Sequence, residues 1–243
     1  ENNSATHGAG IYAAGTVSIS GNGHVIFSGN EAQKGSAIYA ASGSLVDIYD
    51  NNGDVKFTNN EISTGDTSTG AIHLCSGATL KLRDNVAVVF ESGKNGRCVL
   101  YGESGSFAHL SGNKTVTISL NETMQTSIIQ TAGTVYLHDN IGNVELNNNS
   151  ALQASGAVFT LNGSSALLSV CGNRGSITAA GNYATEAGGV IRAESGSHIL
   201  ICDNADISIT GNSSRSGAAA IDSDGSIHIR NNAGRVIFAN NGV

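Results

Sequence analysis

A repeated turn dipeptide constrains the fold of this chain more than any other feature of its sequence. Asp-Asn, Gly-Asn or Asn-Asn follows a short apolar-x-apolar-x stretch eight times, at intervals of 27 to 34 residues. Its asparagines are Asn22, Asn51, Asn85, Asn113, Asn140, Asn173, Asn204 and Asn232. Self-similarity at a near-constant period is typical of a solenoid, and alternation at period two predicts strands.

Two further patterns run through the same repeat. The first reads apolar-x-apolar, two residues, then Asn, and it begins with Val25-Ile26-Phe27 and Asn30. Its asparagines are Asn30, Asn60, Asn121, Asn149, Asn182, Asn212 and Asn241, while Gly93 stands at this position in the third repeat. The second is a run of small residues that ends in an aliphatic one, as in Gly35-Ser36-Ala37-Ile38. Each repeat is therefore expected to hold three short strands and three turns.

Three short strands cannot bury a face alone, but stacked repeats can, because each strand pairs in parallel with its counterpart in the next coil. Parallel crossovers are almost always right-handed. The sequence thus predicts an all-β protein, a right-handed parallel β-helix (solenoid) of about eight three-strand coils. The repeat is continuous, so residues 1–243 are interpreted as one domain.

The turn asparagines are expected to stack as two internal Asn ladders. Asn tolerates left-handed backbone geometry, and its amide can both donate to and accept from the Asn one coil away. Alternation also predicts which apolar side chains point inward. One stack should hold Ile19, Ile48, Leu82, Leu110, Leu137, Val170, Ile201 and Ile229, and another Phe27, Phe57, Phe90, Ile118, Leu146, Ile209 and Phe238.

Composition narrows the function. Pro is absent, which suits parallel strands that need every backbone donor. The net charge is −7 and no Lys/Arg cluster exists, so nucleic acid is not an expected partner. No apolar run is long enough to cross a bilayer as a helix. The chain begins in mid-repeat, and we expect it to be a fragment of a longer protein.

The four cysteines fall into two groups. Cys171 and Cys202 occupy the same outward position of consecutive coils, so they could form a disulfide or remain thiols. Cys98 falls on a small inward position, and Cys75 ends a first strand without an obvious partner. Both are expected to be free thiols.

The repeat also resembles a known family. Phe-x-x-Asn turns, such as Phe27-Ser28-Gly29-Asn30 and Phe238-Ala239-Asn240-Asn241, lie near Gly-Ser-Ala-Ile, Gly-Ala-Ile or Gly-Gly-Val-Ile. This pairing resembles the polymorphic outer-membrane protein repeats of Chlamydia. The resemblance implies an autotransporter passenger domain at the bacterial cell surface, often adhesive, attached to the outer membrane only through a missing C-terminal barrel.

An enzyme on a β-helix scaffold is the main rival. A polysaccharide lyase or glycoside hydrolase needs clustered carboxylates facing each other across the scissile bond. Here Asp50, Asp84, Asp139 and Asp203 belong to the repeated turn, and Asp222 and Asp224 form a short acidic turn. The histidines are spread around the rod, and no metal site or cofactor is expected. We therefore expect no enzymatic activity.

A row of outward residues is the best candidate for binding. Each of its residues comes directly after the aliphatic anchor of the first strand of a coil, and the row consists of Tyr12, Tyr39, His73, Tyr101, Ile129, Phe159, Arg192 and Ile221. Tyr12, Tyr39, His73, Tyr101 and Phe159 form its aromatic strip, and contiguous exposed apolar strips mark interaction sites. The expected function is a non-enzymatic extracellular adhesin that binds a host-cell or neighbouring-cell surface protein or glycan. A structural stalk is the second alternative, and the oligomeric state is left open.

Overall fold

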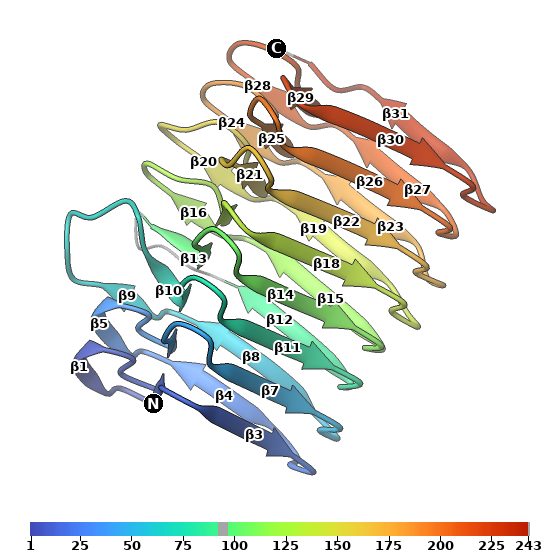
Figure 1. Cartoon of the computed structure of the whole chain (residues 1–243). Helices are drawn as coiled ribbons and strands as arrows, with labels where there is room; N and C mark the ends of the chain where they lie inside the picture. Colours follow the sequence, from blue (N-terminus) through green and yellow to red (C-terminus); the bar gives the residue numbers. More distant parts are fainter. Residues whose placement is uncertain (92–96, 243) are drawn as a thin grey trace.

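The structure, a computed structural model, describes residues 1–91 and 97–242. Parallel pairing joins the strands of successive coils into three sheets of eight strands each. Figure 1 shows the coils stacked along one axis, with the two termini at opposite ends of the rod. The predicted parallel β-helix of about eight coils is confirmed.

Each of the three sheets takes one strand from every coil. Sheet I contains β2 (Ile11–Ala13), β6 (Ile38–Ala40), β10 (Gly70–Leu74), β13 (Cys98–Gly102), β17 (Ile129–Thr131), β21 (Phe159–Leu161), β25 (Ile191–Ala193) and β29 (Ile221–Ser223). Sheet II contains β3 (Thr16–Ser20), β7 (Leu45–Tyr49), β11 (Thr79–Arg83), β14 (Phe107–Ser111), β18 (Thr134–His138), β22 (Leu167–Cys171), β26 (His198–Cys202) and β30 (Ser226–Arg230). Sheet III contains β4 (Val25–Ser28), β8 (Asp54–Thr58), β12 (Ala87–Glu91), β15 (Thr115–Ser119), β19 (Val144–Asn147), β23 (Ile177–Ala180), β27 (Ile207–Thr210) and β31 (Val236–Ala239).

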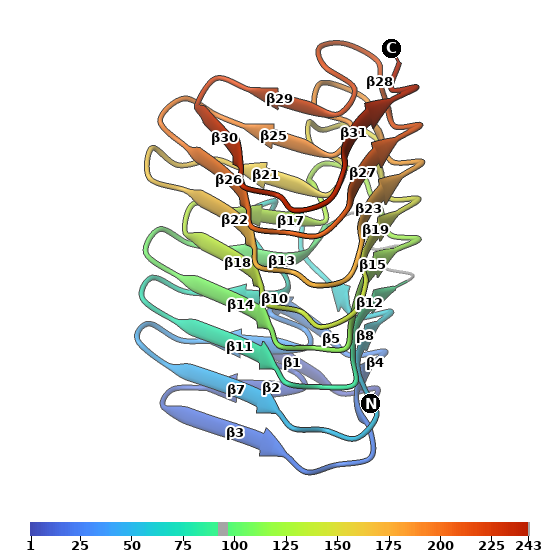
Figure 2. The same ribbon diagram turned by 90° about the vertical axis from the view of Figure 1, so that its right-hand side faces the viewer.

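A fourth short strand follows sheet III in several coils, which the sequence pattern did not predict. These strands are β1 (Ser4–His7), β5 (Glu31–Lys34) and β9 (Glu61–Ile62) in one small sheet, and β16 (Glu122–Thr123), β20 (Ser150–Ala151), β24 (Tyr183–Ala184) and β28 (Ser213–Ser214) in another. Figure 2 shows the three main sheets enclosing the axis, with loops leading from one face to the next.

The core is a set of narrow stacks, as the period-two alternation predicts. Ile48, Leu82 and Leu110 of sheet II are buried and aligned by strand register. Phe27, Phe57 and Phe90 of sheet III stack with ring centroids 4.9 and 5.0 Å apart. The stacks are less covered in the last coil, where Ile229 is 39% and Phe238 is 45% exposed.

Both Asn ladders are present, and Asn85 shows their bonding. Its Nδ2 donates to Asn113 Oδ1 at 3.3 Å and to the Ile48 carbonyl at 3.0 Å. Its Oδ1 accepts from Asn51 Nδ2 at 2.9 Å and from the Asn51 backbone N–H at 3.2 Å. Each buried amide therefore ties one coil to the coils on both sides of it.

The second ladder begins one coil earlier than the sequence analysis predicted. Asn3 donates to Asn30 Oδ1 through Nδ2 at 2.9 Å and through its backbone N–H at 3.1 Å. Asn30 in turn donates to Asn60 Oδ1 at 2.8 Å. The ladder runs from Asn121 to Asn241 in the later coils. Gly93, expected at this position in the third coil, lies outside the described residues.

The left-handed backbone lies one residue before each ladder Asn, not at the Asn itself. In the first ladder the preceding Asp50 and Asp84 have φ of 51° and 57°, and Gly112 has φ of 66°. This explains the Asp-Asn and Gly-Asn dipeptides, because Gly and Asp tolerate this region. Leu120 is the exception, with φ of 56° and a side chain that is 53% exposed.

The cysteines lie where the register places them. Cys171 pairs with Cys202 across β22 and β26, and the two are joined by a disulfide with an S–S distance of 2.17 Å. Cys75 and Cys98 are free and buried, as predicted. Burial raises the pKa of the Cys98 thiol to about 12, and its Sγ donates to the Thr69 carbonyl at 3.1 Å.

Candidate functional site

The outward residues of sheet I form one continuous column along the rod. Strand register aligns Tyr12, Tyr39, His73, Tyr101, Gln130, Thr160, Arg192 and Asp222. We call this row the outer column. The outer column differs from the predicted row in three coils. There Ile129, Phe159 and Ile221 align with the inward residues Leu100 and Ile191, so they belong to the inner face of sheet I.

The assignment of Phe159 to the exposed aromatic strip was therefore wrong. Phe159 is 1% exposed and belongs to the hydrophobic core. A shift of one residue moves a strand side chain to the opposite face of its sheet. In the sixth coil the small Ala179 stands on sheet III where the neighbouring coils have Leu146 and Ile209, and the ring of Phe159 packs into the core from sheet I.

The first half of the outer column is a stack of rings. Tyr12 and Tyr39 lie 5.3 Å apart between ring centroids, Tyr39 and His73 5.3 Å, and His73 and Tyr101 5.2 Å. Tyr12 is 56% exposed, and Tyr39 and Tyr101 are half-buried. His73 is only 1% exposed, so the expectation that it presents an exposed surface for binding was wrong.

A group of ligating side chains surrounds His73, and the sequence analysis missed it. A ring nitrogen of His73, Cys75 Sγ and a Glu103 carboxylate oxygen all lie within 4.8 Å of one another. Burial lowers the pKa of His73, and the neighbouring Glu103 carboxylate only partly opposes this shift. Cys75 does have a partner, since its Sγ lies 3.1 Å from Tyr39 Oη. That hydrogen bond, together with burial, raises the pKa of Tyr39 to about 12.

Glu103 is held in place on the neighbouring coil. Its Oε1 lies 3.2 Å from His73 Nε2, and its Oε2 accepts from the backbone N–H of Ser76 at 3.0 Å. Burial alone would raise the pKa of Glu103, but the hydrogen bonds from Ser76 and His73 outweigh it and lower the pKa. The carboxylate is therefore ionised and oriented toward the imidazole.

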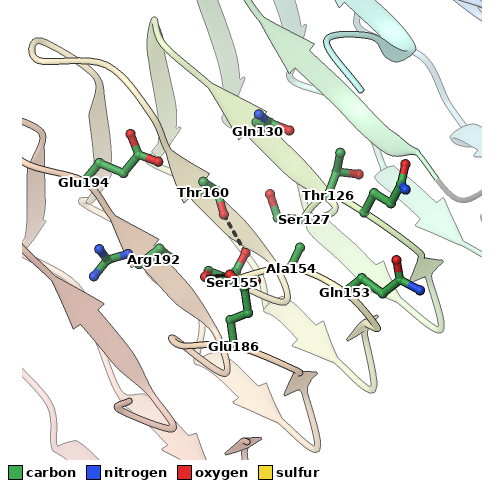
Figure 3. A pocket seen from close by; sticks show the side chains of 11 residues that line it. Thr126, Ser127, Gln130, Gln153, Ala154, Ser155, Thr160, Glu186, Arg192 and Glu194 are labelled. Atoms are coloured by element: carbon green, nitrogen blue, oxygen red, sulfur yellow. Dashed lines mark hydrogen bonds between the residues drawn. The ribbon is translucent and has the colours of Figure 1, made fainter. Parts of the chain in front are cut away.

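The second half of the outer column forms the base of a polar groove of about 380 Å³. Figure 3 shows its side chains on neighbouring strands and on the loops beside them. The groove is lined by Gln125, Thr126, Ser127, Gln130, Gln153, Ala154, Ser155, Thr160, Glu186, Arg192 and Glu194. Amides, hydroxyls and carboxylates thus face the same space, one coil beyond the ring of Tyr101.

Hydrogen bonds fix several of these groups. Thr160 Oγ1 donates to the Ser155 carbonyl at 2.7 Å, the contact drawn in Figure 3, and Ser155 Oγ donates to Glu186 Oε2 at 2.8 Å. Arg192 forms ion pairs with both Asp222 and Asp224. The acidic turn is therefore engaged by a guanidinium group, and it does not present two free carboxylates to a substrate.

The aspartates of the repeated turn have a structural role. Asp50, Asp84, Asp139 and Asp203 all have positive φ between 51° and 57°. They stand where the backbone must turn before each ladder Asn, as the sequence analysis proposed. The outward face of sheet II holds other paired charges, including Arg83, which donates to both carboxylate oxygens of Asp47 at 3.1 and 3.0 Å.

The chain matches no protein-family model, no curated protein and no solved structure at a significant level of similarity. Over residues 1–91 and 97–242, no helix combines the length and hydropathy of a membrane span.

Proposed function

We propose that this chain is a non-enzymatic binding rod displayed outside the cell, and that the outer face of sheet I is its binding surface. The observation that carries the proposal is the continuity of the outer column. The exposed ring of Tyr12 and the half-buried rings of Tyr39 and Tyr101 lead, past the buried His73, into the polar groove at Gln130, Thr160 and Arg192. Such a surface suits an elongated ligand that crosses several coils.

The chemistry of the surface favours a glycan chain on a host or neighbouring cell. The rings of Tyr12, Tyr39 and His73 stack face to face, so the column offers ring edges to a sugar, and the groove amides and carboxylates can bond to sugar hydroxyls. The strands hold Gln130, Thr160 and Arg192 in register, and Thr160 and Arg192 are also restrained by a hydrogen bond and by ion pairs, so these residues lose less conformational entropy on binding. An extended surface protein is the alternative ligand for the same face.

The repeat motifs themselves are unavailable for binding. The rings of Phe27 and Phe57 stack inside the core, and the amides of Asn30 and Asn60 are buried in the second ladder. The Phe-x-x-Asn pairing that resembles the chlamydial repeats is therefore used to build the coil. Ligand recognition must therefore use residues that differ from coil to coil, and the outer column consists of such residues.

Two observations support a cell-surface location and an autotransporter origin. Disulfides persist mainly in oxidising, extracellular compartments, and Cys171 is bonded to Cys202. The resemblance of the repeats to autotransporter passengers points the same way. A solenoid also suits export, because each coil templates the next as it emerges.

The test is attachment of the fluorescently labelled chain to epithelial and bacterial cells. We expect saturable attachment that disappears when the cells are treated with glycosidases and persists after protease treatment. The double variant Gln130→Ala/Thr160→Ala should bind at least ten-fold more weakly. A residue-matched control, Gln33→Ala/Thr117→Ala, alters polar side chains outside the groove and should bind normally.

Other results would point to the rival functions. Full attachment by the groove variant would exclude the groove as the binding surface. The absence of attachment to any cell would favour a structural stalk. Release of oligosaccharides from acidic polysaccharides would favour a lyase or hydrolase.

A further inference from the structure

The cluster of His73, Cys75 and Glu103 has the composition and geometry of a metal site. We propose that these three side chains bind a divalent transition metal, with Zn²⁺ as the best match. Imidazole, thiolate and carboxylate are the ligand types of protein zinc sites, and three protein ligands leave a fourth position for water. This inference concerns a metal site and does not depend on the proposed binding of a glycan.

The distances are close to those of a tetrahedral site. Zinc–ligand bonds of about 2.0–2.3 Å place neighbouring ligand atoms roughly 3.3–3.7 Å apart. His73 Nε2 already lies 3.2 Å from Glu103 Oε1, and the three ligand atoms lie within 4.8 Å of one another. To bind one ion, the widest of these separations would have to shorten by about 1 Å.

Outer hydrogen bonds orient the ligands as they do in known metal sites. In the metal-free site the Nε2 proton of His73 bonds to Glu103, and a bound ion would take the place of that proton. His73 Nδ1 lies 3.2 Å from Thr69 Oγ1, so in the metal-bound form it could donate to this hydroxyl and turn the Nε2 lone pair toward the ion. Glu103 Oε2 accepts from the Ser76 backbone N–H at 3.0 Å and from Ser76 Oγ at 3.3 Å, so Oε1 remains directed at His73.

Access and charge also fit. His73 and Cys75 are buried, but the Glu103 side chain is 37% exposed and provides a route from solvent. Binding would transfer the Cys75 proton to water, and the thiolate and the Glu103 carboxylate together neutralise a dication. The Tyr39 hydroxyl, 3.1 Å from Sγ, can then donate to the thiolate.

The test is metal titration of the whole chain after treatment with a chelator. Co²⁺ should bind with a stoichiometry of one per chain and produce a thiolate-to-cobalt charge-transfer absorption in the near ultraviolet, which added Zn²⁺ should displace. Cys75→Ser should abolish that absorption. Glu103→Gln should weaken Zn²⁺ binding at least ten-fold in calorimetry with a competing chelator. His73→Gln should do the same if it folds.

Cys98→Ser is the matched control, because it removes the other buried free thiol and leaves the cluster intact. It should retain the absorption and the affinity. Absence of the absorption in the folded parent chain, its persistence in Cys75→Ser, or its loss in Cys98→Ser would each overturn the proposal. No cell or glycan is present in this titration, so its failure would not bear on the proposed function. Failure of the cell-attachment test would likewise not bear on the metal site.

Discussion

Phe159 on β21 and Ala179 on β23 line the same small apolar cavity, of about 30 Å³, inside the sixth coil. The neighbouring residues aligned with Ala179 are Leu146 and Ile209, and those aligned with Phe159 are Ile129 and Ile191. In the sixth coil the largest inward side chain of the three main sheets therefore lies on sheet I, and the smallest lies on sheet III.

This relationship predicts energetic coupling between the two positions. Phe159→Ile should enlarge the cavity and destabilise the rod, and Ala179→Phe should overpack it, at a cost of about 1–3 kcal/mol. The double variant should lose less unfolding free energy than the two single variants lose together, with a coupling energy of about 0.5–3 kcal/mol. Urea denaturation of the four proteins measures this cycle, and strict additivity would argue against a shared cavity.

A second prediction concerns the first ladder. Asn85→Leu keeps the side-chain volume but removes the side-chain donor to the Ile48 carbonyl and the acceptor of the Asn51 backbone N–H. It also removes the two ladder bonds that join Asn85 to Asn51 and Asn113. At about 1–3 kcal/mol for each buried unsatisfied group, the total loss should exceed 2 kcal/mol.

The matched control for the ladder is Asn52→Leu, the same substitution at an exposed residue next to the ladder. A surface change of this kind should stay within about 0.5 kcal/mol. Thermal unfolding of the two variants gives the comparison. Equal melting temperatures would show that the buried amides contribute nothing beyond their volume.

Leu120 offers a stabilising change. Its φ of 56° is a left-handed conformation that costs a branched apolar side chain about 1–2 kcal/mol, and its exposure means that little packing is lost on replacement. Leu120→Asn should therefore raise the melting temperature. Leu200→Asn, on a regular strand of sheet II, should not. A lower melting temperature for Leu120→Asn would refute the strain argument.

Two half-buried histidines of sheet II, His109 and His138, predict a pH dependence. Burial lowers the pKa of His109, with the Lys81 and His138 charges adding to the shift, and burial lowers the pKa of His138 despite the opposing charge of Asp139. Below pH of about 6.5 the unfolded chain therefore takes up protons that the folded chain resists. The stability should be complete above this pH, fall as the pH drops from about 6.5 toward the lower pKa values of the folded chain, and level off below them.

The variant His109→Gln/His138→Gln removes these two groups. Its melting temperature should fall less than that of the parent chain between pH 7.5 and pH 5, by a few degrees. The ring of Tyr136, 4.6 Å from that of His109, remains in place in both proteins. Parallel curves for parent and variant would indicate that other groups account for the acid sensitivity.

The sequence predicted those parts of the fold that are marked by the same motif in every coil. The turn dipeptide fixes the register of sheet II, so the inner stack from Ile48 to Ile201 and the neighbouring positions of Cys171 and Cys202 were predicted correctly. The sequence left open whether these two cysteines form a disulfide. Sheet I has only a run of small residues as its anchor. Nothing local to Phe159 shows which face it takes, because that depends on Ala179 in another strand of the coil.

The ligand cluster could have been found from the same register. Once Leu74 is paired with Gly102, Cys75 and Glu103 follow at equivalent points of neighbouring coils. Sequence reasoning treated each histidine and cysteine separately and placed His73 at the surface. The burial of His73 depends on how the chain between β9 and β10 packs against it, and no sequence pattern specifies that packing.

The bond between Cys171 and Cys202 also determines how the rod would respond to a pulling force. A solenoid held only by contacts between neighbouring coils can be peeled from an end, one coil at a time. The disulfide closes a loop of 31 residues between the sixth and seventh coils, and this length cannot extend while the bond is intact. Reduction would release about 100 Å of additional chain. The oxidised rod therefore has a built-in limit to its extension when its two ends are pulled apart.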